Sequence, residues 1–191
     1  TAVAELQIPD TVTVIEYKAI SNCPKLTEIK IPVSVTKIGT SAFEYCTGLK
    51  GLEIGENVTE IGSNAFKGCS ALEELVIPDS VNNIGDYAFY NCESLINVEL
   101  SEKLEYLGKY AFSNCDSLVS IRIPKSLTQC GLYHNNTGMP EGPFSYCDNL
   151  IQIEFEEGVT EIPEALLAGC TAVAELQIPD TVTVIEYKAI S

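Results

Sequence analysis

Apolar residues recur along this chain with a period of 23 residues, in the same order in each period. Counted from the first residue of a unit, they occupy positions 3, 6, 8, 12 and 15, as residues 24–46 show. Alternation at positions 6 and 8 predicts a short, half-buried strand, and a proline at position 9 in five units ends it. One unit cannot bury its apolar side chains alone, so the period predicts a solenoid of stacked units. The units are residues 1–23, 24–46, 47–69, 70–92, 93–115, 116–147, 148–170 and 171–191.

The second half of each unit carries a glycine and an Ala-Phe pair. Glycine at position 16 indicates a sharp turn at a place where a side chain would clash. Ala-Phe at positions 19 and 20, as in Ala88-Phe89, predicts one helical or 3₁₀ turn that carries the phenylalanine into the core. The glycines are Gly39, Gly62, Gly85, Gly108 and Gly131.

Seven of the eight cysteines share position 23 of their units. Because they occupy one structural position, we expect them to point inward in register as a ladder of buried, reduced thiols rather than as disulfides. Cys130 replaces an apolar residue at position 15 and is also expected in the core. No CxxC motif or Cys/His cluster occurs, so no metal site is predicted. The ladder consists of Cys23, Cys46, Cys69, Cys92, Cys115, Cys147 and Cys170.

The combined pattern, LxxIxIPxxVTxIGxxAFxxC, resembles the BspA-like (Treponema-type) leucine-rich repeat family. The resemblance covers essentially the whole chain and implies a single leucine-rich-repeat domain over residues 1–191. It implies an arc-shaped solenoid of about eight rungs without obvious caps, with parallel strands on the concave face and short strands and 3₁₀ or helical turns on the convex side. It also implies an extracellular or cell-surface module for adhesion or binding. Residues 163–167, and Glu16 and Ile20 in the first unit, depart from the pattern.

Charge and motifs exclude several classes of function. The formal net charge is −16 with only 11 Lys and Arg residues, which argues against nucleic acid and against anionic membrane surfaces. No apolar run approaches the roughly 20 residues of a membrane span, so no membrane insertion is expected. No catalytic motif is present and the single histidine lies in an irregular segment, so we expect neither an enzyme nor a cofactor.

The repeat is interrupted once, by the nine residues 134–142 in the sixth unit. Asn, Gly and Pro dominate this insertion, which predicts a surface loop, either tolerated without a role or used in recognition. Beside it, three successive units carry tyrosine at position 18, predicting a vertical aromatic stripe that Tyr90 and Tyr106 flank. The rings either pack on one another to cover the surface or bind a protein or glycan partner. The candidate binding residues are Tyr87, Tyr106, Tyr110, Tyr133, His134, Asn135 and Asn136, and the glycosylation sequons begin at Asn57 and Asn135.

Outward-facing positions 5 and 7 of the predicted strands form a mostly acidic strip. Like charges on neighbouring rungs would repel each other by a few tenths of a kcal/mol, up to roughly 1. A basic partner or Ca²⁺ would explain the strip, and so would solubility alone. No loop has the spacing of an EF-hand, so a specific Ca²⁺ site is not supported. The strip consists of Glu5, Glu28, Glu53, Glu74, Glu99 and Glu154.

Residues 1–21 and 171–191 are identical, at an offset of 170 residues that equals seven units plus the insertion. Either the chain is a window on a longer array with a 170-residue super-repeat, or the overlap was engineered. Two functions therefore remain open. One is a binding or adhesion module with a protein or glycan ligand. The alternative is a structural unit that associates end to end with further repeats in a continuous fibre or surface filament.

Overall fold

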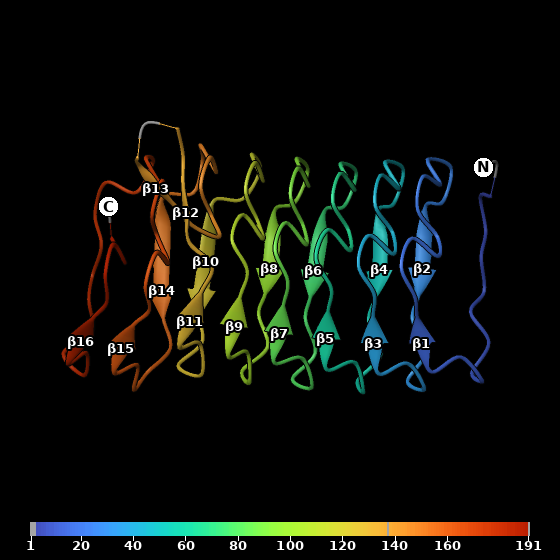
Figure 1. Ribbon diagram of the computed structural model, residues 1–191, viewed down its shortest axis with the longest axis horizontal. Coiled ribbons are helices and arrows are strands. Elements are labelled where there is room, and N and C mark those ends of the chain that lie inside the picture. Colours follow the sequence, from blue (N-terminus) through green and yellow to red (C-terminus); the bar gives the residue numbers. More distant parts are fainter. Residues whose placement is uncertain (1–2, 137, 191) are drawn as a thin grey trace.

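A computed structural model, in which residues 3–136 and 138–190 are described, shows a stack of rungs along one long axis (Figure 1). Each rung is a flattened loop with a strand on either side, and the described ranges contain strands and turns but no helix. None of these residues therefore belongs to a helix that could cross a membrane. The stack has about seven turns of roughly 23 residues, which confirms the predicted leucine-rich-repeat solenoid.

The first ladder of strands comes from positions 5 to 8 of the units. Its strands pair in parallel as β2 with β4, β6 with β8, and β10 with β14. In β2, β6 and β8 the middle residue is buried and its two neighbours are exposed, as the alternating pattern predicted. The members are β2 (Glu28–Lys30), β4 (Gly51–Glu53), β6 (Glu74–Val76), β8 (Asn97–Glu99), β10 (Ser120–Ile123) and β14 (Gln152–Phe155).

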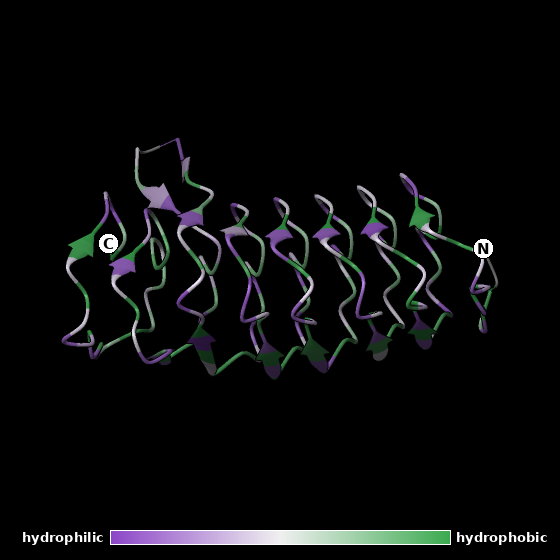
Figure 2. Ribbon diagram, turned by 90° about the horizontal axis from the view of Figure 1, so that it is seen from below, coloured by the Kyte–Doolittle hydropathy of each residue, from purple (hydrophilic) through white to green (hydrophobic). Residues whose placement is uncertain are grey.

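The second ladder comes from positions 14 and 15 and lies on the opposite side of the stack (Figure 2). Six of its strands form one parallel sheet in the order β1-β3-β5-β7-β9-β11, and β15 pairs with β16. The hairpin of β12 (Tyr133–His134) and β13 (Pro140–Glu141) interrupts the sixth unit. The ladder consists of β1 (Val14–Ile15), β3 (Lys37–Ile38), β5 (Glu60–Ile61), β7 (Asn83–Ile84), β9 (Tyr106–Leu107), β11 (Gln129–Cys130), β15 (Glu161–Ile162) and β16 (Val184–Ile185).

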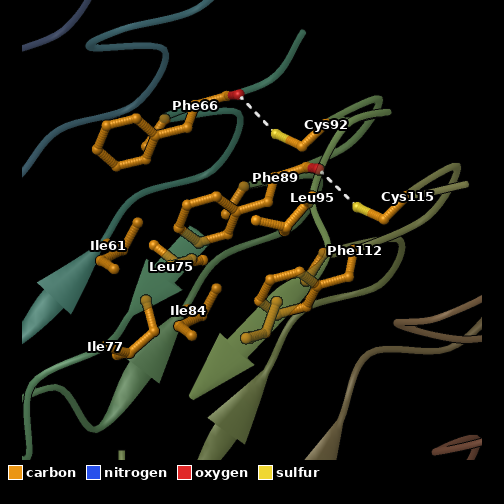
Figure 3. Packing of buried hydrophobic residues seen from close by; sticks show 14 of the residues in the cluster. Ile61, Phe66, Leu75, Ile77, Ile84, Phe89, Cys92, Leu95, Phe112 and Cys115 are labelled. Carbon is orange, nitrogen blue, oxygen red and sulfur yellow. Dashed lines mark hydrogen bonds between the residues drawn. The ribbon is translucent and has the colours of Figure 1, made fainter. Parts of the chain in front are cut away.

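Identical positions stack on one another in the core between the two ladders. The rings of Phe43, Phe66, Phe89, Phe112 and Phe144 form a column with centroids 5.0–5.6 Å apart and nearly parallel planes. Beside it, each position-23 cysteine from the third unit on directs its thiol at the carbonyl oxygen of position 20 in the preceding unit (Figure 3). All eight cysteines lie in the described ranges and none forms a disulfide.

The glycines at position 16 mark a close approach between rungs. A Cβ atom added at Gly108 would lie 2.4 Å from backbone atoms of the preceding rung, and one at Gly131 would lie 2.1 Å away. Real Cβ atoms do not approach backbone so closely, so these positions require glycine because of packing.

The turn that carries the Ala-Phe pair is not the expected helical or 3₁₀ turn. Positions 18 and 22 have positive φ, for example 57° at both Ser41 and Tyr45, and this left-handed backbone breaks any helix. As a result, the backbone N–H groups of every second residue in this turn point along the axis of the stack. The N–H of Phe43, for instance, donates to the carbonyl oxygen of Ala65 at 2.7 Å. The turns therefore form a third hydrogen-bonded ladder between rungs.

The first and last units contribute only half a rung each. Residues 3–13 and 171–183 form no strand, so Glu5 lies outside the first ladder. Leu6 and Ile8 are partly buried against the core rather than enclosed by it. The stack thus amounts to about seven turns rather than the expected eight, because a rung needs a neighbour on both sides to enclose its apolar side chains.

Candidate functional site

The position-18 tyrosines form a contiguous stripe. The ring centroids of Tyr87 and Tyr110 are 5.0 Å apart, and those of Tyr110 and Tyr133 are 5.7 Å apart. Tyr90 packs edge-on against Tyr87 at 5.6 Å. The stripe is unevenly exposed, since Tyr110 is 7% exposed and Tyr133 is 40% exposed. Tyr110 is therefore part of the interior, Tyr133 faces solvent, and Tyr87 is half-buried.

Two further tyrosines, both at position 22, extend the stripe. Tyr45 reaches it through Lys67, whose ammonium lies 5.5–6.0 Å from the rings of Tyr45, Tyr87 and Tyr90. The hydroxyl of Tyr146 donates a hydrogen bond to the carboxylate of Glu141, which also accepts one from Tyr110. Alignment of the units brings both tyrosines to position 22. They belong to units that are not adjacent, so a pattern of tyrosines in successive units did not predict them. We call Tyr45, Tyr87, Tyr90, Tyr133 and Tyr146 the aromatic surface.

Glu141 ties the insertion to the aromatic surface. It is 5% exposed and accepts hydrogen bonds from the hydroxyls of Tyr110 and Tyr146 and, at 2.7 Å, from Nδ2 of Asn135. The N–H of Met139 donates to Oδ1 of Asn135 at 2.9 Å and closes the hairpin. The inserted segment is therefore a β-hairpin anchored by a buried carboxylate, which differs from the expected loop.

Burial and hydrogen bonding oppose each other in setting the pKa of Glu141. Burial alone would raise this pKa, but the bonds from Tyr110, Tyr146 and Asn135 outweigh burial and lower it. Burial, reinforced by the bond to Glu141, raises the pKa of the Tyr110 hydroxyl. The carboxylate thus stays ionised and the hydroxyls stay protonated, the states in which all three bonds persist.

The other candidate residues around the stripe lie in different settings. His134 and Asn136 are exposed on the hairpin. Tyr106 lies in β9 and its hydroxyl donates to Oδ1 of Asp86 at 3.5 Å, without a ring contact to the stripe within the described ranges. Its predicted place flanking the stripe therefore has no support in the geometry.

Both sequon asparagines use their side-chain amides within the fold. Nδ2 of Asn57 donates to the carbonyl oxygen of Val33 at 2.8 Å, and Nδ2 of Asn135 donates to Glu141. Thr137, the third residue of the second sequon, lies outside the described residues. Glycosylation at either site stays a prediction that would require these bonds to break.

The glutamates of the acidic strip do not face one another across the paired strands. Among paired strands each glutamate faces a neutral or basic residue, as in Glu28 with Gly51, Lys30 with Glu53, and Glu154 with Arg122. Lys30 forms a 2.5 Å ion pair with Glu53. The expected repulsion between glutamates on neighbouring rungs is thus absent from these pairs, because each strand's charges are offset from those of the next.

A groove of about 1320 Å³ follows the ends of these strands across the second to sixth units. Carboxylates such as Glu56 and Glu102 line it together with Lys30 and Arg122, and Val76 is 57% exposed in the middle of the row. No group of three or more His, Cys, Asp or Glu residues in the described ranges is arranged to hold a metal ion. The groove has mixed charge, and none of its lining residues belongs to the aromatic surface.

A family model described as the BspA type leucine rich repeat region matches the chain in six copies, over residues 1–96 and 59–191. The chain belongs to this BspA-type leucine-rich repeat family. No curated protein matches it. BspA-type repeats thus account for both halves of the chain, which confirms the resemblance inferred from the sequence pattern.

Solved structures place this BspA-type chain among bacterial leucine-rich repeat proteins. A leucine rich repeat protein from T. pallidum shares 29% identity with a TM-score of 0.73, covering 90% of this chain and 73% of that one. One from Bacteroides ovatus shares 33% identity with a TM-score of 0.60, covering 91% and 49%. A leucine rich cell surface protein from Faecalibacterium prausnitzii shares 31% identity with a TM-score of 0.55, covering 94% and 52%. The chain spans about half the length of the last two proteins.

Proposed function

We propose that this protein is a non-enzymatic binding module that acts at the cell surface or outside the cell and recognises its partner through the aromatic surface. The observation that supports this most directly is the cluster of exposed and half-buried tyrosines on a regular stack, next to a hairpin fixed by Glu141. Tyrosine brings a large amphipathic area at low entropic cost and is enriched in protein interfaces. A surface location agrees with the name of the F. prausnitzii protein, a leucine rich cell surface protein.

A protein partner fits this surface better than a glycan. Sugars stack on open ring faces, but the rings of Tyr87 and Tyr110 face each other and Lys67 lies over Tyr87 and Tyr90. The exposed residues of this region are Tyr45, Tyr133 and Tyr146, together with the 60% exposed side chain of Met139 on the hairpin. Tyrosine side chains, which combine an apolar ring with a hydroxyl, and a flexible thioether suit the mixed apolar and polar surface of a protein.

The test combines binding to panels of purified extracellular proteins and glycans with two tyrosine variants. Tyr133→Ala should weaken the strongest interaction at least tenfold while leaving the melting temperature within a few degrees. Tyr17→Ala is the matched control, because Tyr17 is 63% exposed and lies in the first unit, five units before Tyr133. Equal binding by both variants would remove the aromatic surface as the site. Binding to glycans alone would overturn the choice of a protein partner.

A second candidate function, a structural unit of a continuous array, is favoured by the environment of the repeated segment. Ile15 in the first unit is 4% exposed beneath the second unit, whereas its counterpart Ile185 is 53% exposed. A rung with the sequence of residues 24–46 would cover Ile185 as it covers Ile15. Electron microscopy of the native material separates the two functions, since uniform filaments would support an array and discrete particles would contradict it.

A further inference from the structure

Three successive units, the fifth to the seventh, expose a branched apolar side chain at position 4. Ile96 is 52% exposed, Val119 is 45% exposed and Ile151 is 57% exposed. Each of them directly precedes a strand of the first ladder, and these strands, β8, β10 and β14, follow one another along the stack (Figure 1). The N–H of Ile151 donates to the carbonyl oxygen of Val119 at 3.0 Å, so the two residues occupy neighbouring rungs. We call Ile96, Val119 and Ile151 the apolar stripe.

The fold does not require apolar side chains at position 4. In the third and fourth units the same position holds Lys50 and Glu73, whose charged groups lie 3.7 Å apart in an exposed ion pair. Ile96 follows Glu73 in this column, because the N–H of Ile96 donates to the carbonyl oxygen of Glu73 at 2.9 Å. Charged residues are therefore accepted at this position in the same stack. Packing does not explain the apolar stripe, and contiguous exposed apolar residues mark interaction sites.

A column of carboxylates accompanies the apolar stripe in the same three units. Position 1 holds Glu93, Asp116 and Asp148, all exposed, whereas the second to fourth units have uncharged residues there. The fifth and sixth units adjoin at this column, since the N–H of Ser117 donates to the carbonyl oxygen of Glu93 at 3.1 Å. Within the described ranges none of the three carboxylates forms an ion pair. Positions 1 to 5 of these units contain no Lys or Arg. We call the three residues the carboxylate column.

The carboxylate column determines which kind of partner fits the apolar stripe. Carboxylates without a cationic partner, in a chain of net charge −16, attract a basic surface and repel an acidic one. An anionic lipid surface is excluded for the same reason. On its other side the stripe adjoins uncharged residues, since position 5 holds Asn97, Ser120 and Gln152. The complementary surface is therefore apolar along one line and basic along the line beside it.

The spacing of the stripe matches one face of a helix better than one face of a strand. Neighbouring rungs are about 4.8 Å apart, so Ile96 and Ile151, which are two rungs apart, are separated by roughly 9.6 Å along the stack. Residues i and i+7 on one helix face are about 10.5 Å apart, with residue i+3 or i+4 between them. Three successive residues on one face of a strand span about 13 Å. A helix that lies along the stack can therefore place one apolar residue on each of the three rungs.

We propose that the apolar stripe is a docking site for a basic amphipathic helix of another protein. The apolar residues of the helix contact the stripe, and its Lys or Arg residues lie over the carboxylate column. Recognition of a helix through residues i, i+3 or i+4, and i+7 is a recurrent mode of protein binding. None of the six residues belongs to the aromatic surface, so this site is separate from the one assigned to the proposed function.

Two synthetic peptides, titrated with this chain and followed by fluorescence anisotropy at physiological ionic strength, test the shape of the partner. The first is an Ala-rich helix of about 20 residues, because shorter helices are marginal in water, with Leu at i, i+3, i+4 and i+7 and Lys beside this face. The second has the same composition with Leu and Lys at alternate positions, which lie on opposite faces of a strand. The first peptide should bind at least tenfold more tightly. Equal binding, or no binding of the first peptide, would overturn the proposal.

Val119→Asp separates docking on the apolar stripe from simple charge attraction. The change adds a carboxylate, so charge attraction alone would tighten the binding of the Lys-rich helix. The proposal predicts at least a fivefold weakening instead, because a hydrated charge replaces the apolar contact. Val33→Asp is the matched control, since Val33 is 59% exposed in the second unit, and it should not weaken binding. Val119→Ser, which keeps the net charge, takes the place of Val119→Asp if melting shows that variant to be unfolded. Tighter binding by Val119→Asp would contradict the proposal.

The contribution of the carboxylate column is measured at constant net charge. One triple variant replaces the column by amides, and a control triple variant replaces three exposed glutamates of the first three units. The first should weaken binding of the helical peptide at least fivefold more than the control, and should reduce its dependence on NaCl. Equal weakening would overturn the proposal, because net charge alone would then attract the peptide. Tyr133→Ala should leave this binding unchanged, so failure here is distinct from failure of the aromatic surface. The variants are Glu93→Gln/Asp116→Asn/Asp148→Asn and, as the control, Glu16→Gln/Glu28→Gln/Glu56→Gln.

Discussion

The thiol of Cys92 donates a hydrogen bond to the carbonyl oxygen of Phe66, 3.5 Å away in the preceding rung. The next rung repeats the arrangement with Cys115 and Phe89, also at 3.5 Å. The cysteine thus links successive rungs at the place where the phenylalanine column meets the turn. It acts as a small buried residue with a weak donor, and its burial has consequences for reactivity and for pH dependence.

Alkaline pH should destabilise this protein. Burial raises the pKa of Cys46 to about 11 and that of Cys92 to about 12, compared with about 8.5 in an unfolded chain. Below pH 8.5 the thiols are neutral in both states. Above it, only the unfolded state releases the protons, so stability is lost as pH rises towards 11. Thermal melts between pH 7.5 and 10.5 measure the loss, and Cys92→Ala should show a shallower slope, by up to about 1.4 kcal/mol per pH unit.

Truncation of one ring in the phenylalanine column should be costly. Phe89 is fully buried and stacks at 5.2 Å on Phe66 and at 5.1 Å on Phe112. Phe89→Ala should lower the free energy of unfolding by about 3–5 kcal/mol, which denaturant titration measures. Val76→Ala, at an exposed position, should change it by less than about 0.5 kcal/mol. A loss below about 1 kcal/mol for Phe89→Ala would contradict the core described above.

Removal of the Glu141 carboxylate should release the hairpin. Glu141→Ala leaves the buried Tyr110 hydroxyl without its acceptor, at a cost of about 1–3 kcal/mol in unfolding free energy. Adding Tyr110→Phe removes the orphaned hydroxyl and should recover part of that loss, so a double-mutant cycle measures the coupling. If the effects of Glu141→Ala and Tyr110→Phe on the free energy of unfolding simply add, the hydrogen bond between Tyr110 and Glu141 contributes little.

Acid should loosen the same hairpin. Hydrogen bonds lower the pKa of Glu141 in the folded state against the opposing effect of burial, so its contribution is present above the unfolded value of about 4.3. The contribution is lost as pH falls below that value. Hydrogen exchange of residues 133–141 should therefore accelerate between pH 5 and pH 3 more than that of the second ladder, after correction for intrinsic rates. Uniform acceleration across the stack would refute a local effect.

A glycine packed against the backbone of a neighbouring rung and a glycine packed against a flexible side chain should respond differently to substitution by alanine. Gly108→Ala brings a Cβ within 2.4 Å of the backbone of the preceding rung, so it should cost about 1–3 kcal/mol or more. Gly51→Ala in β4 meets only the flexible side chain of Glu28, at 3.2 Å, and should be nearly neutral. Melting temperatures of the two variants provide the comparison, and equal shifts would refute it.

Repetition in the sequence predicted most of the fold. Positions such as Leu26, Val58 and Phe112 are apolar in nearly every unit, and all three are fully buried. The period required that these positions stack, because no unit can enclose them by itself. The turn was harder to predict, since Ala-Phe within a compact segment is compatible with a helix. What decides against a helix is the bonding between rungs, as from the N–H of Phe43 to Ala65, which no single unit encodes.

The candidate site was only partly predictable. The stripe of Tyr87, Tyr110 and Tyr133 follows from the repeat and lies together in the structure. The role of Glu141 does not follow, because its partner Tyr110 is 31 residues away and the insertion has no counterpart in other units. An acidic residue in an Asn- and Gly-rich segment suggests solvent exposure, whereas here three donors compensate its burial.

The phenylalanine column also constrains how the gene for such a protein can change. Each ring stacks on its counterpart 23 residues away, with the single exception across the insertion between Phe112 and Phe144. Unequal recombination that adds or removes whole 23-codon segments preserves this stacking, whereas a shift by any other number places the ring against a different position. The length of the stack can therefore evolve in discrete steps while its cross-section stays constant.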